Sequence, residues 1–579
     1  MLRAAPDATR WRRILRRTLQ VVWVAVRFAW ARRQARQLAE DPAASQNAER
    51  RLAAWLREQC VALGPTFIKV GQALSTRVDL LPLSFIEELA HLQDRVPPFS
   101  TPLARRFIEE ELGQPVGQLF VDFPSEPIAA ASLGQVYQTR LRTGEEVAVK
   151  VQRPDLLERF AVDLAALRLL AGWVARYTDA LGSLPLVEIL DEFDRNLHAE
   201  IDYRREADNA DRFRANFARF PGVAVPKMYR AYSSRRVLTM EFMHGVRVTD
   251  LPALHRLAID PPRLVKHAVH VNLKQLLEDG FYHADLHPGN IMVDQAGSLI
   301  FIDFGLVGEL PRPMQLRLVD TFLHLVDQDV DALVGDMAAL GFIEPGKDPA
   351  PLKPTIRWIL DATYQPLGHR PTFREMTEPL ADIFYRYRLR VPVSFSMIIR
   401  TLISLEGIGL QLDPHFHALD VSIPFAAKLL LTEGGKALRD RFLRELVRDG
   451  RLDWDRLEEL LRLARRDPDF RIGEVLQVGV DWFLSPDGAG LRETLFEAVV
   501  GDPDIDWERI AALGENLLAD PSIDREWLVR RLTCWLLSPD SQPMRQRLTA
   551  ALASDLLAGR WARWHGATRC LRWMRSVVP

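Results

Sequence analysis

This sequence has few cysteines, no long uncharged apolar run and almost no net charge. Its three cysteines (Cys60, Cys534 and Cys570) lie far apart and form no CxxC pair, which argues against a disulfide framework or a cysteine metal site and favours a reducing, cytosolic setting. The longest uncharged apolar run covers 18–26, which is shorter than the ~18 residues that a membrane-spanning helix needs. With 75 basic and 77 acidic residues, the net charge of -2 excludes a surface built throughout to bind nucleic acid.

The chain is globular in composition, and its charge is unevenly distributed. Apolar residues make up 48% and charged residues 26% of the 579 residues, so disordered and fibrous classes are excluded and several domains are expected. Residues 1–40 contain ten arginines, two acidic residues and three tryptophans. A basic helix with aromatic side chains can lie in the headgroup plane of an anionic membrane, so we expect 1–44 to contact such a surface. A helix that packs its Trp and Val side chains on the protein body is the alternative, and a transit peptide is a third interpretation that the bacterial preference for arginine over lysine does not support.

Turn signals and hydrophobic periodicity divide the chain into a basic helix, a helical extension, a β-rich lobe, a mostly helical lobe and a helical tail of unassigned role. The expected boundaries are 1–44, 45–126, 127–243, 244–434 and 435–579. Strands are predicted at 136–141, 147–151, 227–232, 236–242, 291–293 and 299–302. Helical segments are predicted over 155–217 and 262–280, and everything after about residue 310 is helix-patterned.

The sharpest constellation runs from His283 to Asn290 and is followed by Asp303-Phe304-Gly305. Phosphoryl transfer from ATP needs a carboxylate beside the attacking group and oxygen ligands that hold Mg²⁺ on the phosphates. Asp285 can fill the first role, and Asn290 and Asp303 can supply metal ligands from either end of the intervening hairpin. Each of these residues alone would be an ordinary turn or surface residue, but their order and separation are those of a protein-kinase catalytic loop and DFG element.

Lys150 lies near the end of a predicted strand, where a lysine can pair with nucleotide phosphates and with a glutamate from a helix. The glutamate must come from the helix that contains Glu200, Asp202 and Glu206. Asp202, Glu206 and Asn209 are spaced at i, i+4 and i+7, so they are expected on one helix face. Without Lys150, a solvated acidic face would be the better interpretation.

Several features differ from an ordinary protein kinase. The loop before the lysine strand, 129–134, is rich in alanine where a kinase has glycine, and methyl groups restrict the approach of phosphates to the backbone. We therefore expect an altered nucleotide geometry or preference. The catalytic loop has Ala284 where kinases carry arginine, and after Gly305 the chain is predicted to run straight into a helix without an activation segment, so a platform for peptide substrates is not expected.

A second motif precedes both lobes. Lys69, Gln72 and Thr76 are spaced at i, i+3 and i+7 on a predicted helix, so they share a face, and Gly71 would allow another backbone to approach. The alternative interpretation is a helix with a packing glycine.

Together these residues resemble the UbiB (AarF-like) family of atypical kinases. The matching motifs are Lys69-x-Gly71-Gln72, the alanine-rich loop 129–135, Lys150, Glu200-x-Asp202 with Glu206, His283-x-Asp285 to Asn290, Asp303-Phe304-Gly305, Arg400-Thr401 and 406–414. The resemblance covers roughly 55–420, and we recognise nothing beyond about 435. It implies an α+β, two-lobed protein-kinase-like fold with a helical C-terminal extension and an added N-terminal helical hairpin. In family members this hairpin folds over the nucleotide site and blocks peptide substrates.

The resemblance also implies roles for individual positions. Lys150 would pair with Glu206, Lys69 and Gln72 would reach the site near Glu200 and Asp202, and Asn290 and Asp303 would hold Mg²⁺. The implied catalytic residues are Asp285, Lys150, Glu206, Lys69 and Gln72, with support from Gly71, Glu200, Asp202 and His283. The implied contacts with ATP or ADP are Ala129, Ala130, Ala131, Ser132, Gly134, Gln135, Val136, Ala148, Lys150, Glu241 and Met243.

Family members support the biosynthesis of ubiquinone or related isoprenoid quinones, and they look more like ATPases than protein kinases. The resemblance therefore implies an Mg²⁺-dependent, ATP-using kinase or ATPase of quinone or lipid metabolism, with quinone precursors or quinone-biosynthesis enzymes as partners. We expect a cytoplasmic, peripheral protein at the inner face of a bacterial plasma membrane. Many members carry terminal transmembrane segments, which this sequence lacks. Its basic N-terminus, or 560–575 with three tryptophans, would take their place.

Two other functions stay open at this point. A small-molecule phosphotransferase of the aminoglycoside-kinase type shares the His-x-Asp to Asn loop, although Phe304-Gly305 and the Lys69 motif argue against it. A pseudokinase scaffold would bind a nucleotide or quinone intermediate without turnover, and the complete set of catalytic positions disfavours it.

Overall fold

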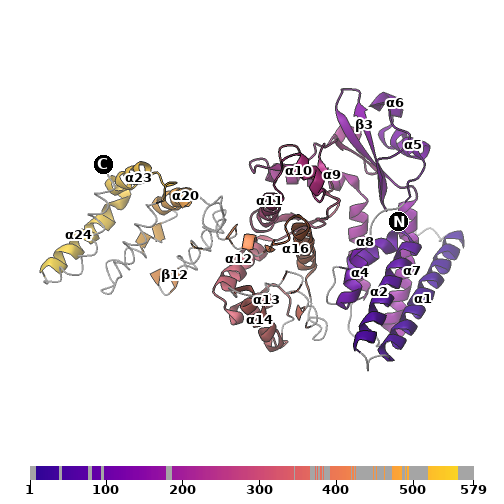
Figure 1. Ribbon diagram of the computed structural model, residues 1–579, viewed down its shortest axis with the longest axis horizontal. Helices are drawn as coiled ribbons and strands as arrows, with labels where there is room; N and C mark the ends of the chain where they lie inside the picture. The colour runs from indigo at the N-terminus through magenta and orange to yellow at the C-terminus, as the bar shows by residue number, and fades with distance from the viewer. Residues whose placement is uncertain are drawn as a thin grey trace, which may run out of the picture. The chain divides into compact units, whose positions relative to one another are not determined.

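The computed structural model of this chain divides into two compact units (Figure 1). The first unit consists of Met1–Arg317 and Gln328–Ala418, and the second of Leu318–Asp327 and Leu419–Pro579. The structure describes residues 8–37, 42–75, 81–92, 97–177, 186–343, 346–364, 391–418, 472–485 and 520–557, with a few shorter pieces between 372 and 493. All the motifs of the expected catalytic site belong to the first unit.

The first lobe is built on a five-stranded antiparallel sheet. Its strands are β1 (Phe120–Val121), β2 (Ala129–Ala130), β3 (Gly134–Leu141), β4 (Glu146–Gln152) and β6 (Val237–Glu241). The spatial order is β1-β3-β4-β6, and β2 pairs with β3. Helices α5 (Thr101–Leu112) and α6 (Val116–Leu119) cover the buried face of this sheet and share a core with Tyr137 and Val149. The alternating pattern of the strand residues is thus satisfied by helices on one face.

Three helices continue the first lobe: α7 (Leu156–Tyr177), α8 (Leu186–Glu200) and α9 (Tyr203–Asn216). The helical run predicted over 155–217 is interrupted between α8 and α9. Asp202 stands at this break, and its carboxylate accepts a hydrogen bond from Arg204 N at 3.2 Å. An aspartate in this position satisfies one of the free N–H groups of the first helical turn, so it fixes where α9 begins.

The strand predicted at 227–232 is wrong. The structure has a 3₁₀ turn there, η1 (Arg230–Tyr232), and only a single isolated bridge to β6. The hydroxyl of Thr239 donates to Tyr232 O at 2.6 Å, so a side chain takes a backbone acceptor that a strand would use. The other five predicted strands are present.

The second lobe is mainly helical and holds two small sheets. One sheet has the order β5-β10-β9-β7 and consists of β5 (Val223–Ala224), β7 (Val246–Arg247), β9 (Ile291–Val293) and β10 (Leu299–Phe301). The other pairs β8 (Phe281–His283) with β11 (Val307–Glu309). The helices are α10 (Leu251–Arg256), α11 (Pro261–Lys274), the π-helical turn η2 (Gln275–Asp279), α13 (Val330–Ala339), η3 (Ala350–Leu352), α14 (Lys353–Tyr364) and α16 (Val393–Leu412). Helix α12 (Arg312–Val326) begins in this lobe, and its residues from Leu318 onward belong to the second unit. Of the helices within the described ranges, only Ser394–Leu412 of α16 is long and apolar enough to cross a membrane, and half of that stretch is buried.

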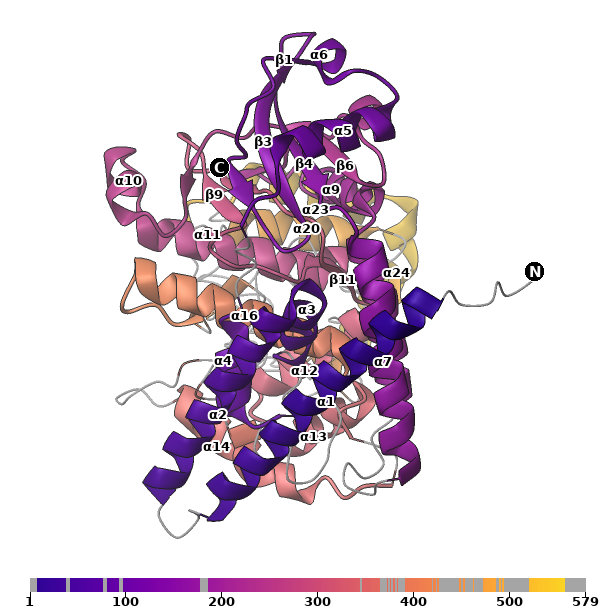
Figure 2. The ribbon, with the colours of Figure 1, turned by 90° about the vertical axis from the view of Figure 1, so that its right-hand side faces the viewer.

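The N-terminal segment forms helices that pack beside α7. They are α1 (Ala8–Gln37), α2 (Pro42–Leu63), α3 (Pro65–Leu74) and α4 (Leu83–Ala90). Figures 1 and 2 show α1, α2 and α7 side by side. One face of α1 buries Ile14 and packs Phe28 on Phe85, whereas Trp11, Trp23 and Trp30 are 50–62% exposed. The alternative in which α1 packs its Trp and Val side chains on the protein body thus holds for Val21, which packs against the cluster around Cys60 and Phe67, and does not hold for the tryptophans.

The second unit is mainly helical in its described part. Its elements are α20 (Ile472–Leu484), α23 (Arg525–Leu537), η5 (Pro539–Ser541), α24 (Gln542–Leu557) and a short hairpin of β12 (Val447–Arg448) and β13 (Arg451–Leu452). This hairpin is an exception to the helical pattern predicted after residue 310. The tryptophan-containing stretch 560–575 lies outside the described residues. A sheet-based lobe, a helical lobe and helical additions together confirm the predicted α+β class.

Candidate active site

Lys150 is the centre of a charge cluster in which the side chains of Lys150 and Glu206 are largely buried and that of Asp303 is 38% exposed. It lies on β4, Glu206 lies in the first turn of α9, and Asp303 follows β10, so three elements meet here. Lys150 Nζ is 2.9 and 3.0 Å from the two carboxylate oxygens of Glu206 and 3.3 Å from Asp303 Oδ2. The expected pair between Lys150 and Glu206 is present, and the same ammonium group also reaches Asp303.

Burial and the surplus of negative charge set the ionisation of this cluster. Burial disfavours the charge on Lys150, but the carboxylates of Asp303 and Glu206 outweigh it and raise the pKa of Lys150 above its ordinary value. Burial also disfavours ionised Asp303, but Lys150 and the Gly305 N–H outweigh it and hold the pKa of Asp303 below its ordinary value. For Glu206 burial prevails and raises the pKa to about 7, which the charge of Lys150 only partly offsets. Glu206 is therefore the member of the cluster that takes up a proton first.

His283 joins the two loops that carry the predicted catalytic aspartates. Its Nδ1 accepts a hydrogen bond from Asp285 N at 3.1 Å, so the proton of the neutral ring lies on Nε2, which donates to Asp303 O at 2.6 Å. The side chain is buried, and burial lowers the pKa of His283, which favours this neutral form. Gln275 holds the backbone in turn, because its Oε1 accepts from His283 N at 2.8 Å. The imidazole thus fixes Asp285 relative to Asp303.

Asn290 and Asp303 offer the oxygen atoms that a magnesium ion needs. Ile302 N donates to Asn290 O at 3.2 Å, which brings Asn290 beside the residue that precedes Asp303. The Asn290 side-chain amide donates to Asp285 O at 3.3 Å, and the Asp303 carboxylate accepts from Gly305 N at 2.9 Å. Carboxylate and amide oxygens suit Mg²⁺, which takes its other ligands from phosphates and water in nucleotide sites. The donor set therefore fits the predicted metal.

Asp285 is paired with a cation from a distant helix. Its Oδ1 accepts a charged hydrogen bond from Arg400 Nη2, and Arg400 lies on α16. The next residue on that helix, Thr401, has its hydroxyl 3.4 Å from His283 O. The catalytic loop is thus held against α16 at two successive positions.

Lys69 reaches the same site from the N-terminal helices. It projects from α3 and forms an ion pair with Glu200, the last residue of α8. Glu200 borders the turn after Asp303, since a Cβ atom added to Gly305 would lie 4.0 Å from Glu200 Cγ. The positive charge of Lys69 also contributes to the lowered pKa of Asp303.

Two other residues of the N-terminal motif contact the neighbouring N-terminal helices. Gln72 Nε2 donates to Leu92 O at 3.1 Å, just beyond α4. A Cβ atom at Gly71 would lie 2.3 Å from Leu92 Cδ1 and 3.4 Å from Cys60 Sγ, so Gly71 faces side chains. The predicted approach of another backbone is wrong, and the packing glycine is what the structure has. Thr76 lies outside the described residues.

Asp202 differs from its predicted neighbours on α9. Glu206 binds Lys150, and Asn209 Nδ2 donates to Phe304 O at 2.9 Å, so these two residues face the site. The carboxylate of Asp202 caps the helix and pairs with Arg204 at 2.8 Å, and the guanidinium lowers its pKa. A shared face for all three residues was wrong because the capping position has a non-helical backbone.

The alanine-rich loop forms β2, a turn and the start of β3. Ala131 O accepts from Arg153 Nε at 2.8 Å, which ties the turn to the end of β4, and Ser132 is fully buried. A Cβ atom at Gly134 would lie 2.5 Å from the Tyr203 hydroxyl, so the backbone can pass here only without a side chain. The Tyr203 ring also lies 5.2 Å from Lys150 Nζ. The one glycine kept in this loop thus makes room for a buried tyrosine beside the lysine.

The remaining predicted nucleotide contacts lie along the sheet. Gln135 binds the backbone of Phe99 through its side-chain oxygen at 3.0 Å and nitrogen at 3.1 Å, and Glu241 accepts from Lys227 N at 3.0 Å. The side chain of Gln135 is fully buried, so any contact of Gln135 with a nucleotide would use its backbone. The other contacts, Ala129, Ala130, Val136, Ala148 and Met243, belong to β2, β3 and β4 or directly follow β6.

The connection after Asp303 is short. β11 pairs antiparallel with β8 only two residues after Gly305, so a strand precedes α12 where the sequence predicted a direct entry into a helix. A Cβ atom at Gly308 would lie 2.1 Å from the Tyr282 ring, so the two strands pack without a gap. Residues 306–311 contain no kinase-type activation segment.

Two residues of the site, Arg153 and Tyr203, were missed from the sequence, and Arg400 was identified only as part of a family motif without a role. Arg153 directly follows the lysine strand, and Tyr203 directly follows Asp202, so proximity to known motifs could have found both. Arg400 is 115 residues from its partner Asp285, and no local pattern links the two.

Comparisons with known proteins agree with this geometry. The ABC1 atypical kinase-like domain matches residues 91–337, and the UbiB helical domain matches residues 372–417. A protein of Synechocystis, sll0005, is 39% identical over 491 residues, which are 85% of this chain and 71% of that protein. The chloroplastic protein ACTIVITY OF BC1 COMPLEX KINASE 3 of Arabidopsis thaliana is 39% identical over 77% of this chain and 63% of its own length.

A solved structure of Rv3197 with erythromycin, from Mycobacterium tuberculosis, covers 59% of this chain and 88% of its own, with 24% identity and a TM-score of 0.42. The family expected from the motifs is confirmed by the two domain matches and by the long alignment with the Synechocystis protein. This chain belongs to the ABC1 (AarF, UbiB) family of atypical kinase-like proteins.

Proposed function

We propose that this protein is an Mg²⁺-dependent atypical kinase or ATPase. The observation that carries the proposal is the position of Lys150, bound to both Glu206 and Asp303 while Asp285 and Asn290 lie on the adjoining loop. Family membership supports the same reaction class, because the matching domain is an atypical kinase-like domain.

Each residue of this cluster has a defined task in phosphoryl transfer. Lys150, oriented by Glu206, donates hydrogen bonds to the nucleotide phosphates. Asp285 orients the acceptor hydroxyl or water and accepts its proton. Asn290 and Asp303 would hold Mg²⁺, which would supply positive charge to the phosphates. The short connection after Gly305 offers no peptide platform, so we favour water, a lipid-like molecule or a membrane-associated enzyme complex as the acceptor.

Replacing Asp303 with Asn tests the reaction. Removal of the carboxylate weakens metal binding and takes away one of the two carboxylates that bind Lys150. The rate of ATP hydrolysis with Mg²⁺ should therefore fall on the order of 10²-fold or more. Asp260→Asn, an exposed aspartate at the start of α11, is the matched control and should hydrolyse ATP as the wild type does. Hydrolysis that is unchanged in folded Asp303→Asn would remove the proposed mechanism.

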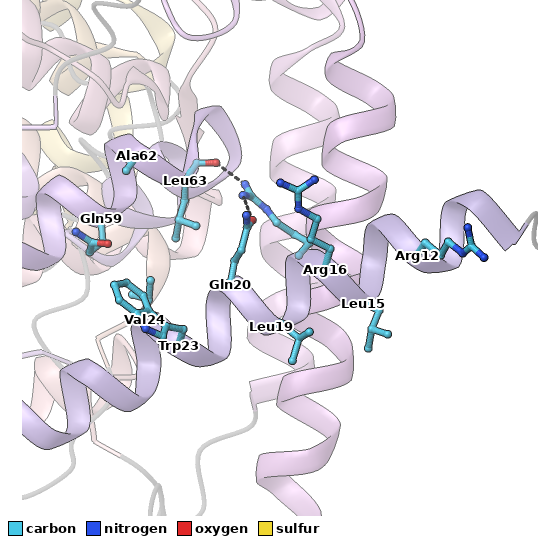
Figure 3. Close-up of a pocket in the computed structure, with 11 residues that line it drawn as sticks. Arg12, Leu15, Arg16, Leu19, Gln20, Trp23, Val24, Gln59, Ala62 and Leu63 are labelled. Carbon is cyan, nitrogen blue, oxygen red and sulfur yellow. Dashed lines mark hydrogen bonds between the residues drawn. The ribbon is translucent and has the colours of Figure 1, made fainter.

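The exposed face of α1 supports contact with an anionic membrane. Six large apolar side chains recur every three or four residues and are exposed: Trp11, Leu15, Leu19, Trp23, Val26 and Trp30. Arg12 and Arg16 lie among them and line a groove of about 640 Å³ between α1 and α2 (Figure 3). An apolar stripe with arginines at its border suits the boundary between headgroups and acyl chains. We propose a peripheral location on the inner face of a bacterial membrane.

Sedimentation with vesicles tests this contact. The double variant Leu19→Glu/Trp23→Glu should lose binding to vesicles that contain phosphatidylglycerol, and wild-type binding should weaken with salt because the arginine contribution is screened. Trp358→Glu changes an equally exposed tryptophan on α14 and should bind normally. Equal binding of all three proteins would rule out α1 as the contact.

We also propose a role in ubiquinone or related isoprenoid-quinone metabolism, which rests on the UbiB relationship. A phenol that resembles a quinone precursor should then change the rate of ATP hydrolysis, whereas a soluble sugar or aminoglycoside should neither change it nor become phosphorylated. Phosphorylation of the soluble compounds would favour the small-molecule phosphotransferase instead.

A further inference from the structure

The ion pair between Arg400 and Asp285 joins the predicted catalytic carboxylate to the UbiB helical domain. Both side chains keep contact with solvent, since Arg400 is 31% and Asp285 is 29% exposed. The pair therefore lies at an open surface of the site and is not sealed inside the lobe. A ligand that approaches Asp285 would meet the guanidinium at the same time.

The position of Arg400 is fixed by the helix that carries it. Tyr282, which is fully buried on β8, donates its hydroxyl to Ser394 O at 2.9 Å near the start of α16. Thr401 contacts His283 O from a position two turns further along the helix. α16 is thus held to the strand that leads into the catalytic loop, and Arg400 projects from this held segment toward Asp285.

The catalytic loop itself supplies no cation beside Asp285. Ala284 is buried there, and the ring of His287 accepts a hydrogen bond from Gly289 N at 3.0 Å. The two lysines of the site are engaged elsewhere, Lys150 with Glu206 and Asp303 and Lys69 with Glu200. Among the residues that the structure describes, Arg400 is the cation that pairs with Asp285 at the acceptor end of the site.

A guanidinium group suits this position because it carries five N–H donors in a planar fork. One nitrogen binds Asp285, and the hydrogen bonds of Arg400 within the described residues are limited to this contact. The other donors can therefore meet phosphoryl oxygens without breaking the pair. Arginine side chains stabilise the charge that spreads over the equatorial oxygens during phosphoryl transfer.

We propose that Arg400 is a catalytic residue that contacts the transferred γ-phosphoryl group while it holds Asp285. This inference rests on the proposed ATP-using function. The oxygen of water or another acceptor forms a bond to the γ-phosphorus, and its proton passes to Asp285. The bond from the γ-phosphorus to the β,γ-bridging oxygen breaks, its electron pair leaves with ADP, and Arg400 neutralises charge on the transferred group.

Steady-state hydrolysis and nucleotide binding by the full chain test the assignment. Arg400→Gln should lower kcat roughly 10²–10³-fold, as loss of a donor or arginine to a transition state does in other enzymes. Mg²⁺–ADP affinity should stay near the wild-type value because ADP lacks the transferred group. The kcat of Arg400→Lys should lie between those of the wild type and Arg400→Gln. Added guanidinium should restore part of the activity of Arg400→Ala. Arg106→Gln removes an exposed pair with Glu110 on α5 and is the control with wild-type kinetics.

A purely structural role predicts a different result. If Arg400→Gln hydrolyses ATP at nearly the wild-type rate, the assignment is overturned. It is also overturned if Arg400→Gln loses ADP affinity together with its hydrolysis rate and guanidinium restores no activity to Arg400→Ala. Asp285→Asn and Asp303→Asn in the same assay separate this outcome from failure of the proposed function. Inactive aspartate variants beside an active Arg400→Gln would reject only the role of Arg400, whereas active aspartate variants would reject ATP turnover at this site.

Discussion

At the scale of single residues, the distinctive feature is that one ammonium group binds two carboxylates, of which Glu206 is buried and Asp303 is partly exposed. Lys150 binds Glu206 and Asp303, and burial raises the pKa of Glu206 to about 7. Ionised Glu206 is therefore costly in the protein without ligand. Binding of a cation near Asp303 would remove part of the negative charge and make ionised Glu206 more favourable.

The raised pKa of Glu206 predicts a pH dependence of stability. Because the folded pKa exceeds the unfolded value of 4.5, the folded state binds more protons between pH 4.5 and about 7. The protonation of Glu206 therefore stabilises the folded state fully below the unfolded pKa. This stabilisation, about 3 kcal/mol in total, is lost as the pH rises through the folded pKa. Urea unfolding at several pH values should show that the free energy of unfolding of the wild type falls by this amount, relative to that of Glu206→Gln, as the pH rises from 4.5 to above 7. Glu126→Gln, at an exposed site, should follow the wild type, and parallel curves for Glu206→Gln would contradict the prediction.

Gly308 gives a second prediction at this scale. A Cβ atom there would lie 2.1–2.6 Å from ring atoms and the hydroxyl of Tyr282, which is fully buried and bound to Ser394 O. The tyrosine cannot easily move, so Gly308→Ala should lower the free energy of unfolding by about 1–3 kcal/mol. Gly335→Ala on α13 has open space around the new methyl group and should raise stability by up to about 1 kcal/mol. Thermal melts of both variants check the pair, and similar melting temperatures would argue against close packing at Gly308.

At the scale of elements, α1 is connected to the Lys69 helix through one buried aspartate. Arg17 Nε of α1 is 2.6 Å from Asp163 Oδ1 on α7, and the Thr66 hydroxyl of α3 binds the other oxygen of the same carboxylate. Arg17 also donates to Leu63 O at the end of α2. Four helices therefore share one hydrogen-bonded group.

Two arginines of α1 allow a matched test of this group. The pair of Arg17 with Asp163 is 19% and 8% exposed, whereas the pair of Arg13 with Glu158 is 55% and 56% exposed. Arg17→Met leaves a buried carboxylate without its cation and should cost about 3–5 kcal/mol. Arg13→Met should cost less than about 1 kcal/mol because water replaces the lost partner. Unfolding by denaturant measures both losses of stability. Equal losses for the two variants would show that burial of the Asp163 pair does not make it more important for stability than the exposed pair.

The strands β3 and β4 and the kinase motifs could be predicted from sequence because they depend on local chemistry. The strand pattern and the hairpin turn predicted β3 and β4, and the spacing of Asp285, Asn290 and Asp303 predicted residues that the structure places on adjoining loops. The strand at 227–232 failed because a hydroxyl from β6 captures a backbone carbonyl there. The cap at Asp202 was read as part of a helix face, since periodicity does not reveal where a helix begins. Arg400 was given no role because its partner is remote in the chain and only the packing of α16 brings them together.

At the scale of the whole molecule, nucleotide binding should stabilise the unit that contains the site. A ligand that binds only the folded state adds RT ln(1 + [L]/Kd), about 2.7 kcal/mol at a hundredfold excess over Kd. Mg²⁺–ADP should therefore raise the melting temperature of the wild type, and Asp303→Asn should lose most of this shift.

The same measurement separates an enzyme from a scaffold. A thermal shift with ATP that is accompanied by phosphate release supports turnover, whereas a shift without release would favour the pseudokinase interpretation. No shift with either nucleotide would contradict nucleotide binding altogether.

The neutral imidazole of His283 has a consequence for how the two loops of the site move. Because one ring bonds to the backbone of both Asp285 and Asp303, a displacement of either loop is passed to the other. The pairing of β8 with β11 and the bond from Ile302 N to Asn290 O connect the same loops. We therefore expect the residues proposed as proton acceptor and metal ligand to shift together, so that a substitution that disturbs one of them also disturbs the other.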